Sequence, residues 1–265
     1  MQPHRSRYWL TPPVERETFE REVQAVCDCY HAAPARAERG VHTMSTDEKP
    51  MQVLERAHPG LPMIPYHVAR RACEYVRHGT QCLIANLDVP TGQMVAPSLG
   101  PTRTEEDVVA HIARTVSTDP DAGWIFIVDN LNTHRSASLV AWVAQACGID
   151  ADLGVKEKRG ILESMATRGV FLGDPAQRIR FVYLPPHTSW LNQGEIWVGT
   201  LSRLVLRRGS HASDAALRHQ GLAFIAHDNR TMAKPITWTY TGRVTPTEQA
   251  SAPAALASPL QAQAA

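Results

Sequence analysis

Apolar residues recur along the chain with two different periods, one typical of helices and the other of strands. Within residues 11–32 they follow the i, i+4, i+7, i+8, i+11 spacing of one helix face: Phe19, Val23, Val26, Cys27 and Tyr30. Similar spacing predicts helices at 102–116, 135–148, 192–208 and 213–229. The segment GWIFIV, at 123–128, is continuously apolar, which is typical of a strand buried on both faces. The segment RIRFVYLPP predicts another strand, which ends at Pro185-Pro186.

Before residue 101 the pattern is strand-like and is divided by turn residues. VHTMSTDEKP (41–50) predicts a short strand that ends in charged residues, with Asp47 at its exit. Residues 70–101 predict further strands, with turns at His78-Gly79 and Pro90-Thr91-Gly92. The predicted order is thus an antiparallel three-strand meander, then helix, strand, helix, strand, helix. This order predicts an α/β fold with a mixed sheet, made of the meander and parallel strands, and with helices on both faces. It is the order of the ribonuclease-H-like fold.

The same pattern divides the chain into segments. We expect an N-terminal helix and linker at 1–40, a main domain at 41–243 and a disordered, Ala/Pro/Gln-rich tail at 244–265. Residues 149–177 are polar, basic and rich in Gly, so we interpret them as an insertion with some helix.

Composition excludes several classes of protein but identifies none. The formal net charge is only +1, so total charge indicates no polyanionic partner. The five cysteines are scattered and odd in number, which argues against a disulfide framework and favours a reducing compartment. No apolar run reaches the ~18–20 residues of a membrane span, and no signal peptide is evident, so we expect a cytoplasmic protein.

Basic residues nevertheless gather in two segments of the second half. Between 156 and 180 there are six Lys or Arg against three acids, and between 195 and 243 seven against three. Such stretches can contact phosphates, although solvated helix faces explain the charge equally well. Our candidates for DNA contact are Lys156, Lys158, Arg159, Arg203, Arg207 and Arg208.

Three acids lie where predicted elements end or begin: Asp47, Asp129 and Glu195. Reactive groups of open α/β sheets gather at such ends, and carboxylates from separate elements suit two shared divalent cations. Each acid also has a purely structural alternative. Asp47 could be a solvated loop charge, Asp129 could cap the next helix, and Glu195 has the capping-box spacing from Asn192.

Polar neighbours of these acids are candidates for orienting them. Asn130, Asn132 and His134 follow Asp129, and Asn192 precedes Glu195. We expect at least one of the first three to hydrogen-bond near the site, unless Thr133 caps a helix there and the Asn residues merely stabilise a turn. At the rigid corner before Glu195, we expect Trp190 and Trp197 to pin the helix start against the core.

Five motifs occur in a fixed order along the chain and together resemble those of a known family. They are STDEKP, VDNLNTH, YLPPHTSWLNQGEIW, RRGSH and AKPITWTYTG. Over about residues 5–243 the chain resembles bacterial insertion-sequence transposases of the mariner-like DDE superfamily. The resemblance implies a retroviral-integrase-like core that uses two Mg²⁺ or Mn²⁺ ions to cleave DNA strands and transfer them in transposition. It assigns the catalytic and metal-binding carboxylates to Asp47, Asp129 and Glu195.

Partners follow from the same resemblance. They are double-stranded DNA, as transposon ends and target, a second copy of the chain, and an upstream helix-turn-helix polypeptide, because no such module precedes residue 5. The protein would associate with the nucleoid when bound to DNA.

Two features depart from the family pattern. Asp129 and Glu195 are 66 positions apart, which the insertion explains, and Gly194, Val198 and Gly199 replace bulkier or polar residues around Glu195. Because helical Gly costs about 0.8–1 kcal/mol relative to Ala, these residues could loosen Glu195. The alternative function is therefore an impaired transposase that only binds DNA or assists assembly.

Overall fold

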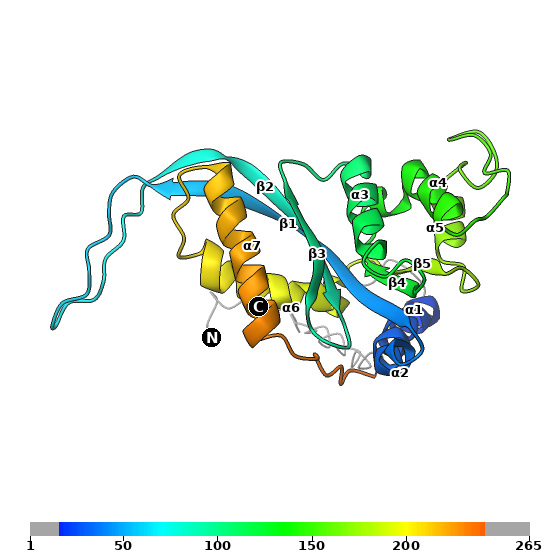
Figure 1. Cartoon of the computed structure of the whole chain (residues 1–265), viewed down its shortest axis with the longest axis horizontal. Coiled ribbons are helices and arrows are strands. Elements are labelled where there is room, and N and C mark those ends of the chain that lie inside the picture. The colour runs from blue at the N-terminus through cyan, green and yellow to red at the C-terminus, as the bar shows by residue number, and fades with distance from the viewer. Residues whose placement is uncertain (1–15, 242–265) are drawn as a thin grey trace, which may run out of the picture.

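A five-stranded mixed sheet forms the centre of the computed structural model, which describes residues 16–241 (Figure 1). The strand order is β3-β2-β1-β4-β5. Strands β1 (Val41–Arg56), β2 (Tyr75–Asp88) and β3 (Met94–Gly100) form the antiparallel meander, and β4 (Gly123–Val128) and β5 (Ile179–Tyr183) add parallel to β1. The predicted fold class is confirmed. The expected tail at 244–265 lies outside the described residues.

The meander strands are longer than their sequence suggests. Strand β1 continues to Arg56, so Asp47 lies inside a strand and not at its exit. The expected turn at His78-Gly79 was also wrong, because β2 runs through it. The register instead shifts between Val53 and Leu54, opposite Gly79, whose φ is 143°. A glycine takes this backbone conformation without strain, so the pair forms a bulge in place of a turn.

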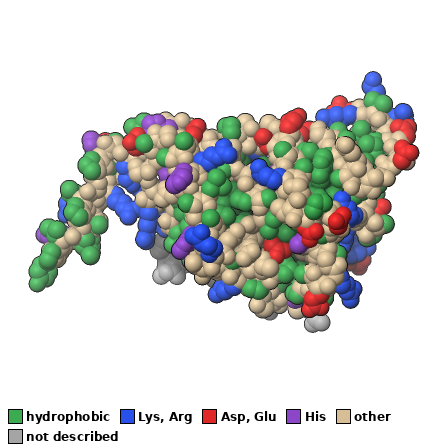
Figure 2. Space-filling model, in the orientation of Figure 1, with side chains coloured by type: hydrophobic (Ala, Val, Ile, Leu, Met, Phe, Trp, Pro, Cys, Tyr) green, Lys and Arg blue, Asp and Glu red, His purple; other side chains and the backbone are tan. Residues whose placement is uncertain are grey.

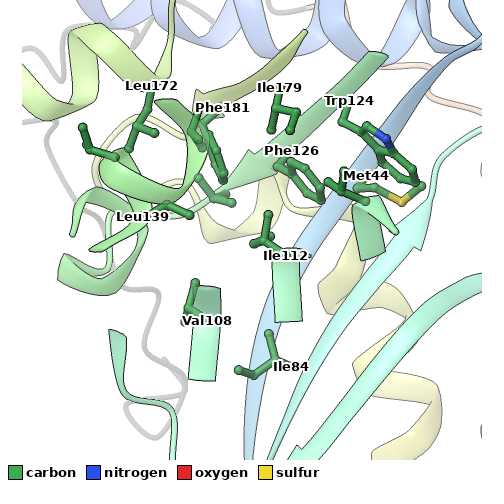
Figure 3. Close-up of a cluster of buried hydrophobic side chains, with 14 of the residues drawn as sticks. Met44, Ile84, Val108, Ile112, Trp124, Phe126, Leu139, Leu172, Ile179 and Phe181 are labelled. Atoms are coloured by element: carbon green, nitrogen blue, oxygen red, sulfur yellow. The ribbon is translucent and has the colours of Figure 1, made fainter. Parts of the chain in front are cut away.

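Helices cover both faces of the sheet. On one face lie α3 (Glu105–Val116), α4 (Ala137–Ala146) and α5 (Met165–Leu172). Figure 3 shows their contact with the sheet, where Ile112 and Leu139 pack with Phe126 and Phe181. On the other face lie α1 (Arg16–His31), α6 (Gln193–Leu201) and α7 (Asp214–Thr231). None of the helices within 16–241 has the length and apolar character needed to cross a bilayer.

The N-terminal segment is part of this core. Val23, Val26 and Tyr30 of α1 pack with Ile125 and Ile127 of β4. The expected linker after α1 contains a short helix, α2 (Ala33–Ala37). Helix α1 is thus part of the helical layer on this face of the sheet.

Two short helical turns lie close in sequence to Asp129 and Glu195. The turn η1 (Asn132–Arg135) follows β4, and η2 (Ser189–Leu191) leads into α6. Helix α6 continues into a wider π-helical segment, η3 (Ser202–Leu206), in place of the regular helix expected to 208. Along α6 and η3, Trp197, Leu201 and Val205 are buried, whereas Leu204 is exposed.

A buried histidine on α3 makes stability depend on pH. The His111 ring is buried, with Nδ1 2.6 Å from the Ser98 hydroxyl. Burial, followed by the charges of Arg114 and His134, lowers its pKa from 6.5 to about 3. In the unfolded chain His111 therefore binds a proton below pH 6.5, whereas in the folded chain it does so only below about pH 3.

We expect His111 to steepen acid destabilisation. As pH falls between these two values, it lowers the free energy of unfolding by up to about 1.4 kcal/mol per pH unit. Denaturant unfolding at a series of pH values measures this slope. His111→Asn should flatten it, whereas His219→Asn, on the exposed face of α7, should not. Equal slopes for wild type and His111→Asn would contradict the assignment.

Candidate functional site

Asp47 lies in the middle of β1, on the face that meets α6. Side chains alternate between the faces of a strand, so Asp47 shares its face with Ser45 and Met51. The Ser45 hydroxyl hydrogen-bonds with Tyr30 of α1 and donates to Asn192 at the start of α6, and Met51 packs against α6. Because Asp47 pairs with Ala85 within the sheet, it is not a solvated loop charge.

Asp129 follows the last residue of β4, next to β1. The parallel register pairs Ser45 with Ile127. The paired part of the two strands ends there, and Asp47 and Asp129 each lie two residues beyond it. The Asp129 carboxylate accepts hydrogen bonds from Leu131 N (2.9 Å) and His134 Nδ1 (3.0 Å). Helix α4 is capped by Ser136, so capping explains neither Asp129 nor Thr133.

Asn192 fixes the start of α6, which carries Glu195, onto β1. The buried Asn192 amide donates to Thr46 O (2.8 Å), and its oxygen accepts from Gly194 N (2.9 Å) and the Ser45 hydroxyl (2.5 Å). Asn192 therefore caps α6 and holds it to the strand. The Glu195 residue is exposed, and its backbone N bonds the Asn192 carbonyl.

Gly194 brings α6 unusually close to β1. A Cβ atom at this position would lie 2.9 Å from Asp47 Cβ and 3.0 Å from Asn192 Oδ1. Gly199 is different, because a Cβ there would meet nothing within 4 Å. Gly194 therefore permits close packing of α6 next to Asp47.

The charges of the three acids act on one another. Burial, then the charges of Glu195 and Glu48, and to a lesser extent Asp129, raise the pKa of Asp47 from 3.8 to about 7. The pKa of Asp47 is thus raised mainly by burial and further by the neighbouring acids.

Asp129 also belongs to a charged triad with Glu48 and His134, in which Glu48 and His134 are buried and Asp129 is partly exposed. His134 Nε2 is 2.7 Å from Glu48 Oε1, and its Nδ1 is 3.0 Å from Asp129 Oδ1. Burial alone would lower the pKa of His134, but the Glu48 charge and the bonds to both carboxylates raise it to about 10. Although burial opposes it, the hydrogen bonds from His134 and Leu131 keep the pKa of Asp129 low.

Ligand atoms of this triad lie within 4.8 Å of one another, so the group could also hold a metal ion. The raised pKa of His134 favours instead a protonated ring that donates to both acids. His134 thus meets the expectation of a polar neighbour that orients Asp129. Sequence analysis missed Glu48, although its place on the strand beside Asp47 puts it on the opposite, buried face.

The other polar neighbours have different roles. Asn130 donates to Leu184 O (2.5 Å) and accepts from Arg135 (2.8 Å), so it ties β4 to the segment after β5. Asn132 is exposed on η1.

The corner at Pro185-Pro186 is held by residues other than those expected. Thr188 donates its hydroxyl proton to Pro185 O (2.6 Å), and the Leu191 side chain is fully buried. Trp197 is buried as expected, but the expectation for Trp190 was wrong, because it is 55% exposed and contacts Tyr240 edge to face. The rigid corner therefore does not depend on burial of Trp190.

Both predicted basic groups are exposed, at different places along the molecule (Figure 1). In the insertion, Lys156 pairs with Glu105 (3.7 Å) and Arg159 with Asp152 (2.7 Å). The second group, Arg203, Arg207 and Arg208, follows α6. In the chain, the first group lies between Asp129 and Glu195, and the second follows Glu195.

Comparison with solved structures finds likenesses to the Mos1 mariner transposase. A paired-end complex with Mn is 12% identical with a TM-score of 0.46, covering 84% of this chain and 59% of that chain. The Mos1 catalytic domain is 10% identical with a TM-score of 0.43, covering 82% of this chain and 85% of that chain. The chain thus spans about three fifths of the Mos1 chain in the paired-end complex. Likenesses at this level assign no function.

A search of curated proteins found no match. A family model described as DDE superfamily endonuclease, in contrast, matches residues 46–218. This is more than half of the chain, and it includes Asp47, Asp129 and Glu195. The chain therefore belongs to the DDE superfamily of endonucleases.

Proposed function

We propose that this chain is the catalytic part of a mariner-like transposase, which cleaves DNA strands and transfers them to a target. The supporting observation is the placement of Asp47, Asp129 and Glu195. Asp47 lies on β1, Asp129 directly follows the neighbouring strand β4, and Gly194 packs the start of the helix that carries Glu195 against Asp47. We assign them as the catalytic and metal-binding residues.

The donor set fits divalent cations. Hard cations such as Mg²⁺ and Mn²⁺ take oxygen ligands, and all three side chains are carboxylates. Burial, and after it the charges of neighbouring acids, raise the pKa of Asp47, and bound cations would favour its charged form. Two ions, when bound, would activate the attacking oxygen and stabilise the leaving oxygen of the phosphodiester.

Surrounding residues hold the carboxylates in place. The protonated His134 ring, anchored by Glu48, fixes the direction in which Asp129 points. Asn192 and Ser45 fix the start of α6, and with it the Glu195 backbone. Preorganisation of this kind matters because misplacement by about 1 Å can cost on the order of 100-fold in rate.

Glu48→Gln tests the supporting role of the triad. It keeps the size of the side chain but removes the charge that faces His134. Since residues that orient metal ligands typically contribute 10–100-fold, we expect plasmid nicking to slow by about that factor. The matched control is Glu55→Gln, which removes the charge from a Glu–His contact of the same length (2.7 Å) in a more exposed part of β1. Similar rates for both variants would show that the triad only stabilises the fold.

The proposed substrate is double-stranded DNA, as transposon ends and target. We assign phosphate contacts to Lys156, Lys158, Arg159, Arg203, Arg207 and Arg208, whose exposure leaves them accessible. The active form would be a homodimer on DNA, with an upstream helix-turn-helix polypeptide to recognise the transposon ends.

The salt dependence of DNA binding tests the second basic group. If Arg203, Arg207 and Arg208 each neutralise one phosphate, changing all three to Ala should reduce the slope of log K against log salt by about 2–3. Filter binding between low and moderate salt gives the slope. A slope equal to that of wild type would show that these three residues do not contact DNA phosphates.

Cleavage of supercoiled plasmid tests the function itself. We expect nicking that requires Mg²⁺ or Mn²⁺, stops with a chelator and resumes when the ion is restored. Joining of a labelled transposon-end duplex to plasmid then tests strand transfer. DNA binding without nicking under all these conditions would favour the impaired, binding-only alternative.

A further inference from the structure

The motif RRGSH, at residues 207–211, lies beside the far part of β1. His211 N donates a hydrogen bond to Leu54 O (2.8 Å), and Arg56 N donates to the Ser210 hydroxyl (3.0 Å). On its other side this part of β1 pairs with β2. The motif is therefore held against the strand end from which residues 57–74 project (Figure 1).

A small pocket lies between the motif and the strand. Its volume is about 170 Å³, and we call it the β1 pocket. Its lining includes Arg56, Arg207 and His211, together with Leu54 and Tyr75. Within residues 16–241, no Asp or Glu lines it. Pockets that hold whole small molecules measure roughly 300–1,000 Å³, so the β1 pocket suits a single small group.

Two nitrogen atoms of this pocket are buried without a partner. In the described part of the chain, neither His211 Nε2 nor Arg56 Nε makes a hydrogen bond. The His211 residue is only 3% exposed. Burial lowers its pKa, so the ring is neutral at pH 7 and Nε2 donates a hydrogen bond in one of the two tautomers. Because buried polar atoms are normally paired, an acceptor in the pocket would satisfy both groups.

Gly209 allows His211 to lie at the wall of this pocket. A Cβ atom at position 209 would collide with His211 Nε2 and would lie 2.7 Å from Val205 O. The Val205 oxygen belongs to the backbone, so the ring of His211 would have to move instead. The glycine of the motif therefore keeps the imidazole in the place from which it can donate into the pocket.

The charge of this region favours an anion. Arg56 and Arg207 are the charged residues of the lining, and guanidinium groups match the geometry of phosphate oxygens. Arg71 lies next to the motif, since its Nη1 donates to Arg208 O (3.3 Å). Figure 2 shows basic side chains gathered where residues 57–74 leave the body of the molecule. A phosphate group is therefore the small anion that fits this pocket best.

The β1 pocket is separate from the three carboxylates. Gln52, Leu54 and Arg56 line it and follow Asp47 on the same strand. Since a strand rises about 3.3 Å per residue, they lie on the order of 15–30 Å from Asp47 along the strand. A phosphate in the pocket is therefore not the one that is cleaved.

We propose that the β1 pocket binds one phosphate of the DNA backbone, with charge from Arg56 and a hydrogen bond from His211 Nε2. The proposal rests on the proposed function only in taking DNA as the ligand, because it requires neither metal ions nor cleavage. Phosphate contacts fix the position of a protein on a duplex without reading its sequence. The pocket would thus hold the duplex at a second point, away from the carboxylates.

Filter binding of the full chain to a duplex, in a chelator, tests the charge. Arg56→Gln should weaken binding about tenfold and reduce the slope of log K against log salt by about 0.9. Arg39→Gln makes the same change at an exposed residue before β1 and should leave both unchanged. An Arg56→Gln chain with wild-type affinity and slope overturns the proposal.

Two substitutions of His211 separate the hydrogen bond from a structural role. Gln can place an amide N–H near the position of Nε2, whereas Asn is too short to reach it. We therefore expect His211→Asn to weaken DNA binding about tenfold and His211→Gln to retain most of the wild-type affinity. Equal loss in both variants, with circular dichroism showing that both are folded, overturns the role of Nε2.

Thermal unfolding with inorganic phosphate, without DNA, tests the pocket itself. If phosphate binds at about 1 mM, a concentration of 10 mM should raise Tm by roughly 2–4 °C. Gly209→Ala should lose this increase because it displaces His211, whereas Gly199→Ala should keep it. An equal increase in both variants overturns the pocket. An increase confined to an intact pocket, combined with wild-type DNA binding by Arg56→Gln, would instead assign the pocket to free phosphate and overturn its role in DNA binding.

Plasmid nicking by the same proteins separates this proposal from the proposed function. A chain that loses DNA affinity with Arg56→Gln but does not nick contradicts only the proposed function. A chain that nicks plasmid, and binds DNA equally well with and without Arg56, contradicts only the pocket.

Discussion

Replacing Asp129 with Asn lowers the rate of metal-dependent plasmid nicking by on the order of 10³-fold or more. Charge stabilisation by bound cations contributes several kcal/mol, and each 1.36 kcal/mol is tenfold in rate. Asn is close to Asp in size but neutral, so it is a poorer ligand for hard cations. It also removes one of the two carboxylates that hold His134.

The matched control for this variant is Asp121→Asn, which makes the same charge change at an exposed residue before β4. It should nick plasmid at the wild-type rate. Filter binding should show that Asp129→Asn still binds DNA, so that the loss lies in the chemical step. If Asp129→Asn retained more than about a tenth of the wild-type rate, the assignment of Asp129 as a metal-binding residue would be wrong.

Gly194→Ala is expected to slow nicking by about 100-fold, although it adds only a methyl group. The new Cβ would meet Asp47 Cβ at 2.9 Å and Asn192 Oδ1 at 3.0 Å, so the start of α6 must move away from β1. A displacement of about 1 Å in a catalytic group can cost on the order of 100-fold. The single-turnover nicking rate, measured at saturating DNA, reports this change.

Gly199→Ala is the matched control, since it makes the same substitution in the same helix. Its Cβ would enter open space. We expect wild-type nicking and an increase of up to about 1 kcal/mol in the free energy of unfolding, because Ala favours helix. If Gly194→Ala and Gly199→Ala were equally active, close packing of α6 on β1 would not position Glu195.

The first strand is longer than its local composition predicts. Charged residues and Pro50 follow Asp47, which usually marks the end of a strand. In the structure, β4 pairs with β1 only as far as Ser45, while β2 pairs with it to Arg56. Among the described strands only β2 pairs with the far part of β1, and proline is tolerated at an edge where no neighbouring strand needs its N–H.

The Glu48–His134–Asp129 triad could not be predicted from the spacing of residues along the chain. Glu48 and His134 are separated by 86 positions, and neither belongs to a local motif that links them. Their contact depends on β1 and the turn after β4 meeting beneath α3. Trp190 shows the converse, since its large apolar ring suggested burial but the structure leaves it mostly exposed.

The sequence by itself determined the order of helices and strands, because apolar periodicity records which side of each element faces the core. It also identified Asp129 and Glu195 as acids at the ends of elements, and the ordered motifs indicated the family. Only the tertiary structure decided that Asp47 faces α6 while Glu48 faces His134, and that Gly194 lets the helix reach the strand. The physical reason is that strand register and the approach of a helix to a sheet are set by contacts between residues far apart in the chain, which no local pattern encodes.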